Sequence, residues 1–533
     1  MNTRWNGKLF ILCICLSLLP VAWFMYLPIT DGPTHVYNAR LLLDYYVTAS
    51  PLAREYYQPN PAPVPNWLAH IVLAAAMTVL SPAGAERVLI AGYVLLLPLA
   101  LRYALRSVTA QPTGLEFLIF PVLFNSHLHW GFYGFCYSLG FCLLAVAVWI
   151  RHSQVMNVKK CLVLAGLLLL AYFSNPIGWL ESVIALCVLA ASGALRRGGR
   201  PSVISRLFGQ SAWIIVAVSP SAILYLLFLA GRVETGRNLL EWPSLRYAAS
   251  NLFKLTPLST FFPAEQYLAA GLAVFLASAV VLFGLRAFRR DLSGLNYLIL
   301  AITGGLLVFV APVSATGGTM ITPRLVYFPL FALLLWLASQ PAGRPWRIIF
   351  AAAGVIAGLG LGALHWPVYV RYDRLMTAFV SEAGRSAGGS TMIFVTFRNK
   401  YAHSLDPGSQ EVNPSGSAGA YVAASQGLVY LNNYEAQTDH FPFLFQSSRD
   451  PANYALYSTE AVQCPVSDGY IDLARYEAGT GRAVDYVVLW APAIAAGNDA
   501  CRQKLIAQVL AQHEAIGTGG KPNYLSLYRR RPE

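Results

Sequence analysis

Long, nearly uncharged apolar stretches recur through the first two thirds of the chain, and they limit the possible fold more than any other feature. Hydrophobic residues make up 56% of the 533 residues, and charged residues make up only 12%. A soluble globular domain carries about twice that charged fraction. Stretches of about 20 apolar residues match the thickness of a bilayer core. The sequence therefore predicts a polytopic α-helical membrane protein.

We expect about 11 transmembrane helices. The first apolar run, residues 9–27, is long enough to span and lacks the small-residue cleavage site of a signal peptide. The proline-led segment 61–81 is expected to form a juxtamembrane helix that lies outside and does not cross. The remaining spans are expected near residues 83–103, 116–124, 134–150, 161–173, 178–194, 213–230, 267–285, 297–313, 325–337 and 348–365.

The basic residues indicate how these spans are oriented. Arg4 and Lys8 precede the first span, and later basic clusters such as Arg151 with Lys159 fall in alternate loops. Cytoplasmic loops of membrane proteins carry such an excess of Lys and Arg. We therefore expect a cytoplasmic N-terminus and, after eleven spans, an extracytoplasmic C-terminal region. The net charge of +13 then indicates contact with membrane lipids, and no nucleic-acid partner is expected.

The composition changes near residue 367, where polar residues become frequent. Strand-like runs at 391–397, 428–431 and 484–490 are followed by a helical stretch at 501–513 and a last strand near 524–528. We therefore expect a transmembrane domain over residues 1–366, with a first outer loop at 29–82, and a soluble extracytoplasmic α/β domain over residues 367–533. Cys464 and Cys501 form the only cysteine pair of this second domain, and in an extracytoplasmic setting we expect them to form a disulfide.

An acidic residue, Asp31, follows the first apolar run. Gly32 and Pro33 come next and open a short polar helix that carries His35 and Asn38. Two interpretations remain open at this point. An ionisable group at the mouth of a membrane bundle is a functional candidate, but Asp before Gly-Pro is also an ordinary helix N-cap. His35, one helical turn later, would either orient the carboxylate or cap the same turn.

Two outer turns contain further polar residues within otherwise apolar hairpins. The turn at 125–133 contains His127 and His129, whose side chains would point the same way if the turn were extended. Without a third ligand nearby in the sequence, they indicate only a weak metal site. Glu181 lies just inside the span after the second turn. It is either a functional acid or a structural residue whose negative charge is stabilised by the macrodipole at the start of the helix.

Two segments resemble a known superfamily. The first contains the acid after the opening span, a helix ending in Ala39 and Arg40, a proline-rich entry into the juxtamembrane helix (NPAPVPNWLAHIVL), and a span that ends in arginine. The second is TPRLVYFPLFALLLWLA, residues 322–338. Together they resemble membrane glycosyltransferases of the GT-C superfamily, in the branch that contains aminoarabinose transferase and the protein O-mannosyltransferase relatives. The resemblance covers about residues 1–365.

The resemblance implies sugar transfer, with inversion, from a polyprenyl-phosphate-linked donor to an acceptor hydroxyl of a lipid, glycan or protein. The reaction would take place at the outer face of an inner (plasma) membrane of bacterial type. Asp31 would be the general base, and Arg324 would hold the donor phosphate. Arg324 has a simpler interpretation as an interfacial cation that extends towards water. The remaining candidates for contact with donor or substrate are His35, Asn38, Glu181, His127 and His129.

The sequence departs from the family pattern at two acidic positions. The outer turn 125–133 has no Asp or Glu, and Gly32 stands where the family often has Glu. A bound divalent cation would need His127 and His129, or Glu181, as replacement ligands. We therefore expect a protein that works without metal, and the sequence assigns no cofactor.

Two other functional classes remain open. The first is a transporter or flippase of lipid-linked saccharides, although the sequence lacks the internal repeat typical of many transporters. The second is a non-catalytic membrane scaffold whose outer domain binds a partner. The motifs of common soluble enzymes, such as a phosphate-binding P-loop, HExxH or CxxC, are missing from the sequence.

Overall fold

The computed structural model describes residues 3–196, 203–232, 240–290, 294–315, 318–396, 416–457, 463–464, 469–490, 500–519 and 525–532. Phe397 and Tyr524, at the ends of two predicted strands, lie outside the described residues. The chain is mostly helical and divides into two compact units. The first comprises Met1–Pro20, Ala62–Leu68 and Ile90–Trp366, and the second comprises Val21–Pro61, Ala69–Leu89 and Pro367–Glu533.

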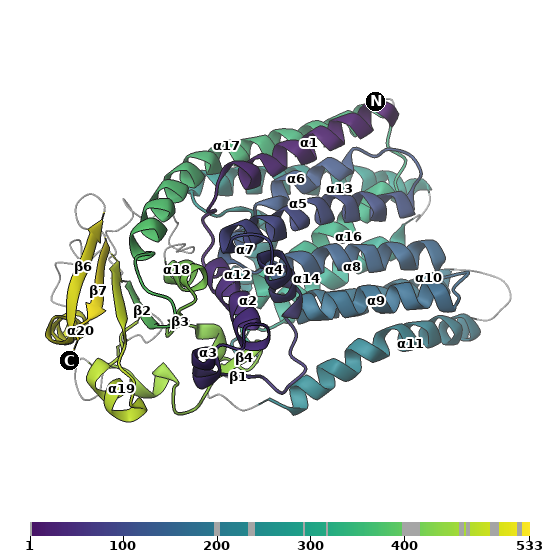
Figure 1. The fold of residues 1–533 in the computed structure, drawn as a ribbon. Helices are drawn as coiled ribbons and strands as arrows, with labels where there is room; N and C mark the ends of the chain where they lie inside the picture. The colour runs from purple at the N-terminus through teal and green to yellow at the C-terminus, as the bar shows by residue number, and fades with distance from the viewer. Residues whose placement is uncertain are drawn as a thin grey trace. The chain divides into compact units, whose positions relative to one another are not determined.

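Long helices make up most of the first unit. They are α8 (Tyr133–His152), α9 (Val158–Ser174), α10 (Pro176–Arg196), α11 (Val203–Ala230), α13 (Pro263–Arg290), α14 (Leu295–Val310) and α16 (Tyr327–Ala338). Shorter elements connect them: η1 (Leu115–Ile119), α6 (Phe120–Leu123), α7 (Ser126–Trp130), α12 (Leu245–Lys254), η2 (Thr256–Leu258) and α15 (Ile321–Arg324). Four helices have residues in both units: α1 (Thr3–Trp23), α4 (Trp67–Met77), α5 (Pro82–Val108) and α17 (Arg344–Ala383). Within the first unit α9 packs between α8 and α11, and α14 packs on α16 (Figure 1).

Among the described residues, eight helices are long and apolar enough to cross a membrane: α1, α5, α8, α10, α11, α13, α17 and the segment Ile321–Ala338 that includes α16. Their surroundings differ. In the Ile321–Ala338 segment 89% of the residues are buried, whereas in α11 only 22% of the most apolar window is buried. Large apolar side chains of α11, such as Ile215 and Leu226, are exposed. Exposed apolar surface of this extent is costly in water and favourable in lipid. The structure is therefore compatible with a multi-pass membrane protein.

Three predicted spans, near residues 116–124, 161–173 and 297–313, are not among these eight helices. α9 has 17 residues and α14 has 16. The apolar run at 116–124 forms only η1 and α6, and every residue of these two elements is buried. An apolar run of this length is equally compatible with a buried core segment. The count of about 11 spans therefore stays a prediction.

A five-stranded sheet forms the core of the carboxy-terminal part of the second unit. Its strand order is β3-β2-β5-β7-β6, with β2 parallel to both β3 and β5 and the other neighbours antiparallel. All six residues of β2 are buried, which explains the four consecutive apolar residues at its centre, 392–395. The strands are β2 (Thr391–Thr396), β3 (Val429–Tyr430), β5 (Tyr486–Trp490), β6 (His513–Gly519) and β7 (Leu525–Arg530). The helical elements of this part are α18 (Gly419–Gln426), η4 (Tyr434–Gln437), η5 (Pro451–Tyr454), α19 (Leu473–Thr480) and α20 (Ala500–Gln512).

The predicted first outer loop contributes much of its length to this second unit. It contains α2 (Gly32–Tyr46), α3 (Pro51–Tyr56) and β1 (Tyr57–Pro59), and β1 pairs antiparallel with β4 (Phe443–Phe445). Tyr57 donates a hydrogen bond to the Tyr430 carbonyl at 2.8 Å. Glu55 forms ion pairs with Arg449 at 2.6 Å and Arg482 at 2.9 Å. Most of this loop therefore belongs to the same compact unit as the carboxy-terminal segment, with which it shares a sheet and polar contacts.

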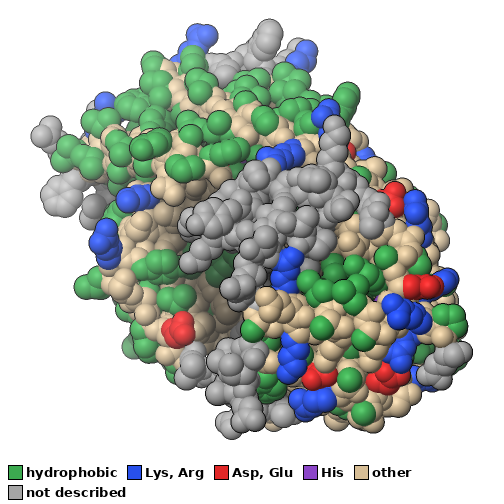
Figure 2. All heavy atoms as spheres, turned by 90° about the vertical axis from the view of Figure 1, so that its left-hand side faces the viewer, with side chains coloured by type: hydrophobic (Ala, Val, Ile, Leu, Met, Phe, Trp, Pro, Cys, Tyr) green, Lys and Arg blue, Asp and Glu red, His purple; other side chains and the backbone are tan. Residues whose placement is uncertain are grey.

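The surface of the second unit carries both signs of charge. Its ion pairs include Arg529 with Glu514 and Arg530 with Glu477, at 2.6 and 2.8 Å. The face drawn in Figure 2 likewise shows basic and acidic side chains interspersed with one another. Interspersed charges are typical of surfaces in contact with water.

A disulfide joins Cys464 and Cys501, the two cysteines that we expected to pair. Their Cα atoms are 5.9 Å apart, and Cys501 lies in the first turn of α20. The bond therefore ties this helix to the segment that follows η5. The six other cysteines are free thiols.

Candidate functional site

Asp31 occupies the N-cap position of α2, but its carboxylate does not cap the helix. Its backbone carbonyl accepts hydrogen bonds from the amides of Thr34 and His35, at 3.0 and 3.2 Å, while its side chain makes no capping hydrogen bond. Pro33, the second residue of the helix, has a fixed φ that suits the first helical turn. The capping interpretation of this carboxylate is therefore not supported, and Asp31 lies partly buried where the helix begins.

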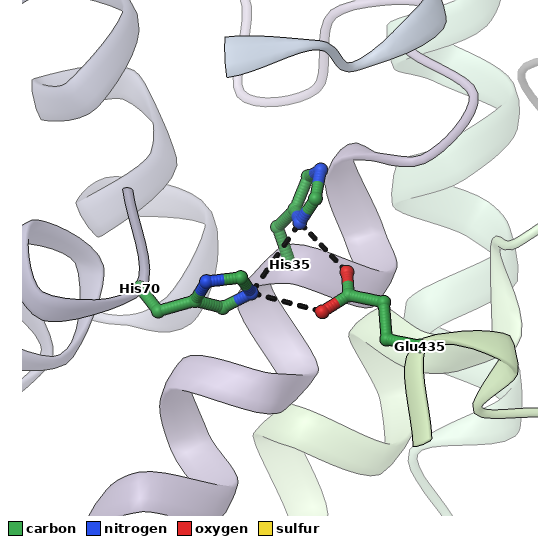
Figure 3. Close-up of side chains that lie close together, drawn as sticks. All are labelled: His35, His70 and Glu435. Atoms are coloured by element: carbon green, nitrogen blue, oxygen red, sulfur yellow. Dashed lines mark hydrogen bonds and ion pairs between the residues drawn. The ribbon is translucent and has the colours of Figure 1, made fainter. Parts of the chain in front are cut away.

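The imidazole of His35 belongs to a buried cluster with His70 and Glu435. His35 lies on α2, His70 on α4 and Glu435 on η4. His35 Nδ1 lies 3.4 Å from His70 Nε2 and 2.7 Å from Glu435 Oε1, and His70 Nε2 lies 2.9 Å from Glu435 Oε2. Figure 3 shows the two rings and the carboxylate directed at one another. We call these residues the His-His-Glu cluster.

Burial and charge act in opposite directions on Glu435 in this cluster. Glu435 is 0% exposed, and His70 is 1% exposed. Burial alone would raise the pKa of Glu435, but the attraction of His35 and His70, together with the hydrogen bond to His70, outweighs it and lowers the pKa to about 2. Glu435 is therefore an ionised carboxylate at neutral pH. The ring of Phe441 lies 5.9 Å from His35 and 6.0 Å from His70, measured between ring centroids, and forms an apolar wall.

Asn38, which the sequence placed among the donor-binding candidates, makes a structural contact beside this cluster. Its side-chain amide and that of Asn433 donate to each other's oxygen, at 2.9 and 3.0 Å. Both residues are buried, with exposures of 2% and 0%. Asn38 follows His35 by three residues on α2, and Asn433 precedes Glu435 by two. The reciprocal pair therefore fixes η4 against α2 and sets the position of Glu435 relative to His35.

We expect Asn38→Ala and Asn433→Ala each to lower the free energy of unfolding by about 1–3 kcal/mol, because each leaves a buried amide without its partner. The double variant should lose much less than the sum of the two, since both amides are then gone. Denaturant unfolding of the detergent-solubilised chain measures the free energy of unfolding of each variant. Asn453→Ala, at an exposed amide that bonds the Ser447 carbonyl, serves as the control and should change stability by less than about 0.5 kcal/mol. Strictly additive losses would contradict a direct amide pair.

His127 lies in the first unit, on α7, where Asn125 caps the helix by accepting from the Leu128 amide at 3.1 Å. Its Nδ1 is 3.0 Å from the Tyr327 hydroxyl, and the ring is 0% exposed. Burial, reinforced by the positive charge of Arg324, lowers the pKa of His127 well below its usual range. Its Nε2 forms no hydrogen bond within the part of the chain that the structure describes. A neutral imidazole with one buried nitrogen available is suited to bind a water molecule or a polar substrate group.

Arg324 ends α15, beside the same group of rings. Its guanidinium carbon lies 4.0 Å from the ring centroid of Phe132 and 5.7 Å from that of Phe135. The side chain is only 8% exposed, so it does not extend into water as an interfacial cation would. Stacking over aromatic faces holds a guanidinium in a defined plane while its donors stay charged.

His129 points to different neighbours from His127. Its ring centroid lies 4.7 Å from that of Phe261 and 5.4 Å from that of His365. The expectation that both imidazoles point the same way assumed an extended turn, but residues 126–130 form helix α7. Residues two apart on a helix face different directions. The HxH pattern therefore does not form a metal site by itself.

Glu181 is buried inside the bundle of the first unit. It lies beyond the first turn of α10, so the helix macrodipole does not account for it. Its carboxyl group is 1% exposed and lines a small, mostly apolar cavity with residues of α8, α14 and α16, among them Cys142, Leu300 and Phe331. The structure does not bring Glu181 to His127, His129 or Arg324 in any described contact.

The sequence did not identify His70 or Glu435 as functional candidates. His70 lies within the apolar stretch WLAHIVLAAAM of α4, and a polar residue at a buried position of such a helix was the only local signal. Glu435 follows His70 by 365 residues. No spacing rule links residues so far apart.

Neither the comparison with models of known protein families nor the search of curated proteins returned a match for this chain.

Proposed function

We propose that this protein is a membrane glycosyltransferase that moves a sugar from a polyprenyl-phosphate donor to an acceptor hydroxyl outside the cytoplasm. The resemblance to GT-C enzymes in the order of the acid, the short helix and the later arginine-containing segment supports this proposal. The observation that carries it is the position of Asp31. This partly buried carboxylate follows the first apolar helix and is not used to cap the helix that it precedes.

The proposed reaction is a single displacement. The acceptor oxygen attacks the anomeric carbon of the donor, the bond from that carbon to the phosphate oxygen breaks, and the configuration is inverted. Asp31 takes the proton of the acceptor hydroxyl, and the polyprenyl phosphate leaves with the bonding electrons. A poorly hydrated carboxylate holds a proton more readily than one in water, which suits a general base.

Arg324 is proposed to bind the donor phosphate. The guanidinium is buried and stacked over Phe132, so its planar face is oriented before any ligand arrives. Its forked donors match phosphate oxygens and keep their charge in an apolar setting. His127, 3.0 Å from the Tyr327 hydroxyl, is a further polar group of this region for contact with the donor.

We also propose on which side of the membrane the carboxy-terminal residues lie. A disulfide persists in an oxidising compartment, so the Cys464–Cys501 bond supports an extracytoplasmic position for the carboxy-terminal residues. The positive-inside pattern of the loops favours the same orientation, with the N-terminus in the cytoplasm and the protein in an inner (plasma) membrane of bacterial type. About eleven spans and a carboxy-terminal α/β domain belong to this proposal.

The direct test is sugar transfer by the purified full chain in lipid vesicles. We would supply polyprenyl phosphates that carry different labelled hexoses or pentoses, together with a membrane extract as the source of acceptors. Label that moves from the donor to an acceptor product supports the proposal. If no donor of the panel is consumed while the chain remains folded, the proposal is wrong.

Arg324→Ala should weaken donor binding by about 10- to 150-fold, the effect of losing hydrogen bonds to a charged group. Arg324→Lys should recover part of this loss, because Lys keeps the charge but not the planar fork. Fluorescence titration with a labelled polyprenyl phosphate measures the affinity. Arg102→Ala is the matched control, since Arg102 also stacks on a phenylalanine, 4.5 Å from the Phe10 centroid. Equal losses in the Arg102 and Arg324 variants would exclude a specific role for Arg324.

A further inference from the structure

The His-His-Glu cluster is the strongest unassigned feature of the described residues. It is the one group of at least three His, Cys, Asp or Glu side chains among them whose possible ligand atoms converge closely enough to hold a metal ion. One ligand atom from each residue lies within 4.8 Å of the others. All three residues belong to the second unit, and they come from three segments that are distant in the sequence.

The contacts inside the cluster do not satisfy it as a hydrogen-bonded ion triad. Glu435 Oε1 lies 2.7 Å from His35 Nδ1 as an ion pair, yet it accepts no hydrogen bond from any described residue. His35 Nδ1 instead faces His70 Nε2 at 3.4 Å. A fully buried carboxylate oxygen without a hydrogen bond is costly. A cation placed between the three ligand atoms would be bound by both imidazole nitrogens and by this oxygen together.

We propose that His35, His70 and Glu435 bind a zinc ion. Two imidazoles and one carboxylate are a set of protein ligands that zinc accepts while a fourth position stays open. Magnesium and calcium prefer sites built wholly from oxygen ligands, so the two histidines disfavour them. The proposal does not depend on sugar transfer.

The distances suit a metal of this size. Zinc bonds of about 2.0–2.1 Å at tetrahedral angles place neighbouring ligand atoms about 3.3 Å apart. The two imidazole nitrogens are already 3.4 Å apart. The distance from His35 Nδ1 to Glu435 Oε1, 2.7 Å, must open by about 0.6 Å to reach that tetrahedral spacing. Rotation of the Glu435 side chain is sufficient for a change of this size.

Neighbouring residues hold the three proposed zinc ligands in position. The reciprocal amide pair of Asn38 and Asn433 holds the helices that carry His35 and Glu435, as hydrogen bonds around metal ligands commonly do. Phe441 limits access of water from one side. A bound zinc would join α2, α4 and η4 and so stabilise the fold of the second unit.

Metal analysis of the purified full chain tests the proposal. We expect about one zinc ion per chain after purification without chelator, and a competition titration with a chromophoric zinc chelator gives the affinity. Glu435→Gln and His70→Gln should each weaken zinc binding by at least about 100-fold. His513→Gln is the matched control, because His513 is also buried in the second unit but bonds the Val484 carbonyl at 2.8 Å. Its zinc affinity should be unchanged.

A second measurement uses the unaltered chain, so it still tests the proposal if the variants fail to fold. Cobalt(II) added to the metal-stripped, unaltered chain should give the intense visible absorption of a tetrahedral site, and zinc should displace it. Zinc should also raise the midpoint of thermal unfolding of the stripped chain. The proposal is overturned if the unaltered chain binds no zinc, if Glu435→Gln binds it as tightly as the unaltered chain, or if cobalt gives only the weak spectrum of an octahedral ion.

Discussion

Replacing Asp31 with Asn should reduce sugar transfer by about 100- to 10,000-fold, the range typical of losing a general base. The substitution removes the proton acceptor but keeps the size of the side chain. Asn is as good as Asp at a helix N-cap, and the Asp31 carboxylate makes no capping hydrogen bond, so α2 should begin as before. The loss should therefore fall on kcat, with donor affinity retained.

The measurement is initial rate against donor concentration in vesicles, with donor affinity measured separately by fluorescence titration. Asp44→Asn provides the matched control on the same helix. Asp44 accepts from Arg40 at 2.9 Å in an ordinary ion pair four residues apart, and its loss should leave transfer nearly unchanged. If Asp31→Asn transfers sugar at the unaltered rate, Asp31 is not the base. Equal loss in both variants would indicate a general effect on α2.

Strands that consist almost wholly of apolar residues could be predicted from the sequence. The runs that become β2 and β5 were recognisable because strands in the interior of a sheet are apolar without interruption. The run at 116–124 shows the limit of the same signal. Apart from Glu116 it is apolar throughout, but it forms a short 3₁₀ helix and a short α-helix that are both buried. Sequence alone does not separate burial in protein from burial in lipid.

The candidate site was only partly recognisable from sequence. His35 and Asn38 were identified because they follow Asp31 on one short helix, but their contacts are made with Glu435 and Asn433, which lie 400 and 395 residues away in the sequence. Such pairs form only after the chain has folded. His127 and His129 show the opposite error, since their close spacing suggested a shared ligand, and the helical conformation of α7 separates them.

Removing the Cys464–Cys501 disulfide should destabilise the second unit by about 4 kcal/mol. The bond closes a loop with a sequence separation of 37 residues, and the loss of loop-closure entropy in the unfolded chain predicts this value. Cys464→Ser with Cys501→Ser should therefore lower the midpoint of denaturant unfolding and speed proteolysis of the carboxy-terminal segment. Cys187→Ser, at an exposed free thiol of α10, is the control and should change neither.

The oxidation state of Cys464 and Cys501 tests on which side of the membrane the carboxy-terminal residues lie. In protein extracted from cells under conditions that block thiol exchange, a thiol reagent applied after unfolding should label six of the eight cysteines, and reductant should expose the other two. Labelling of all eight without reductant would mean that the bond does not form in the cell. That result would place the carboxy-terminal residues in a reducing compartment and contradict sugar transfer at the outer face, because Asp31 belongs to the same compact unit as these cysteines.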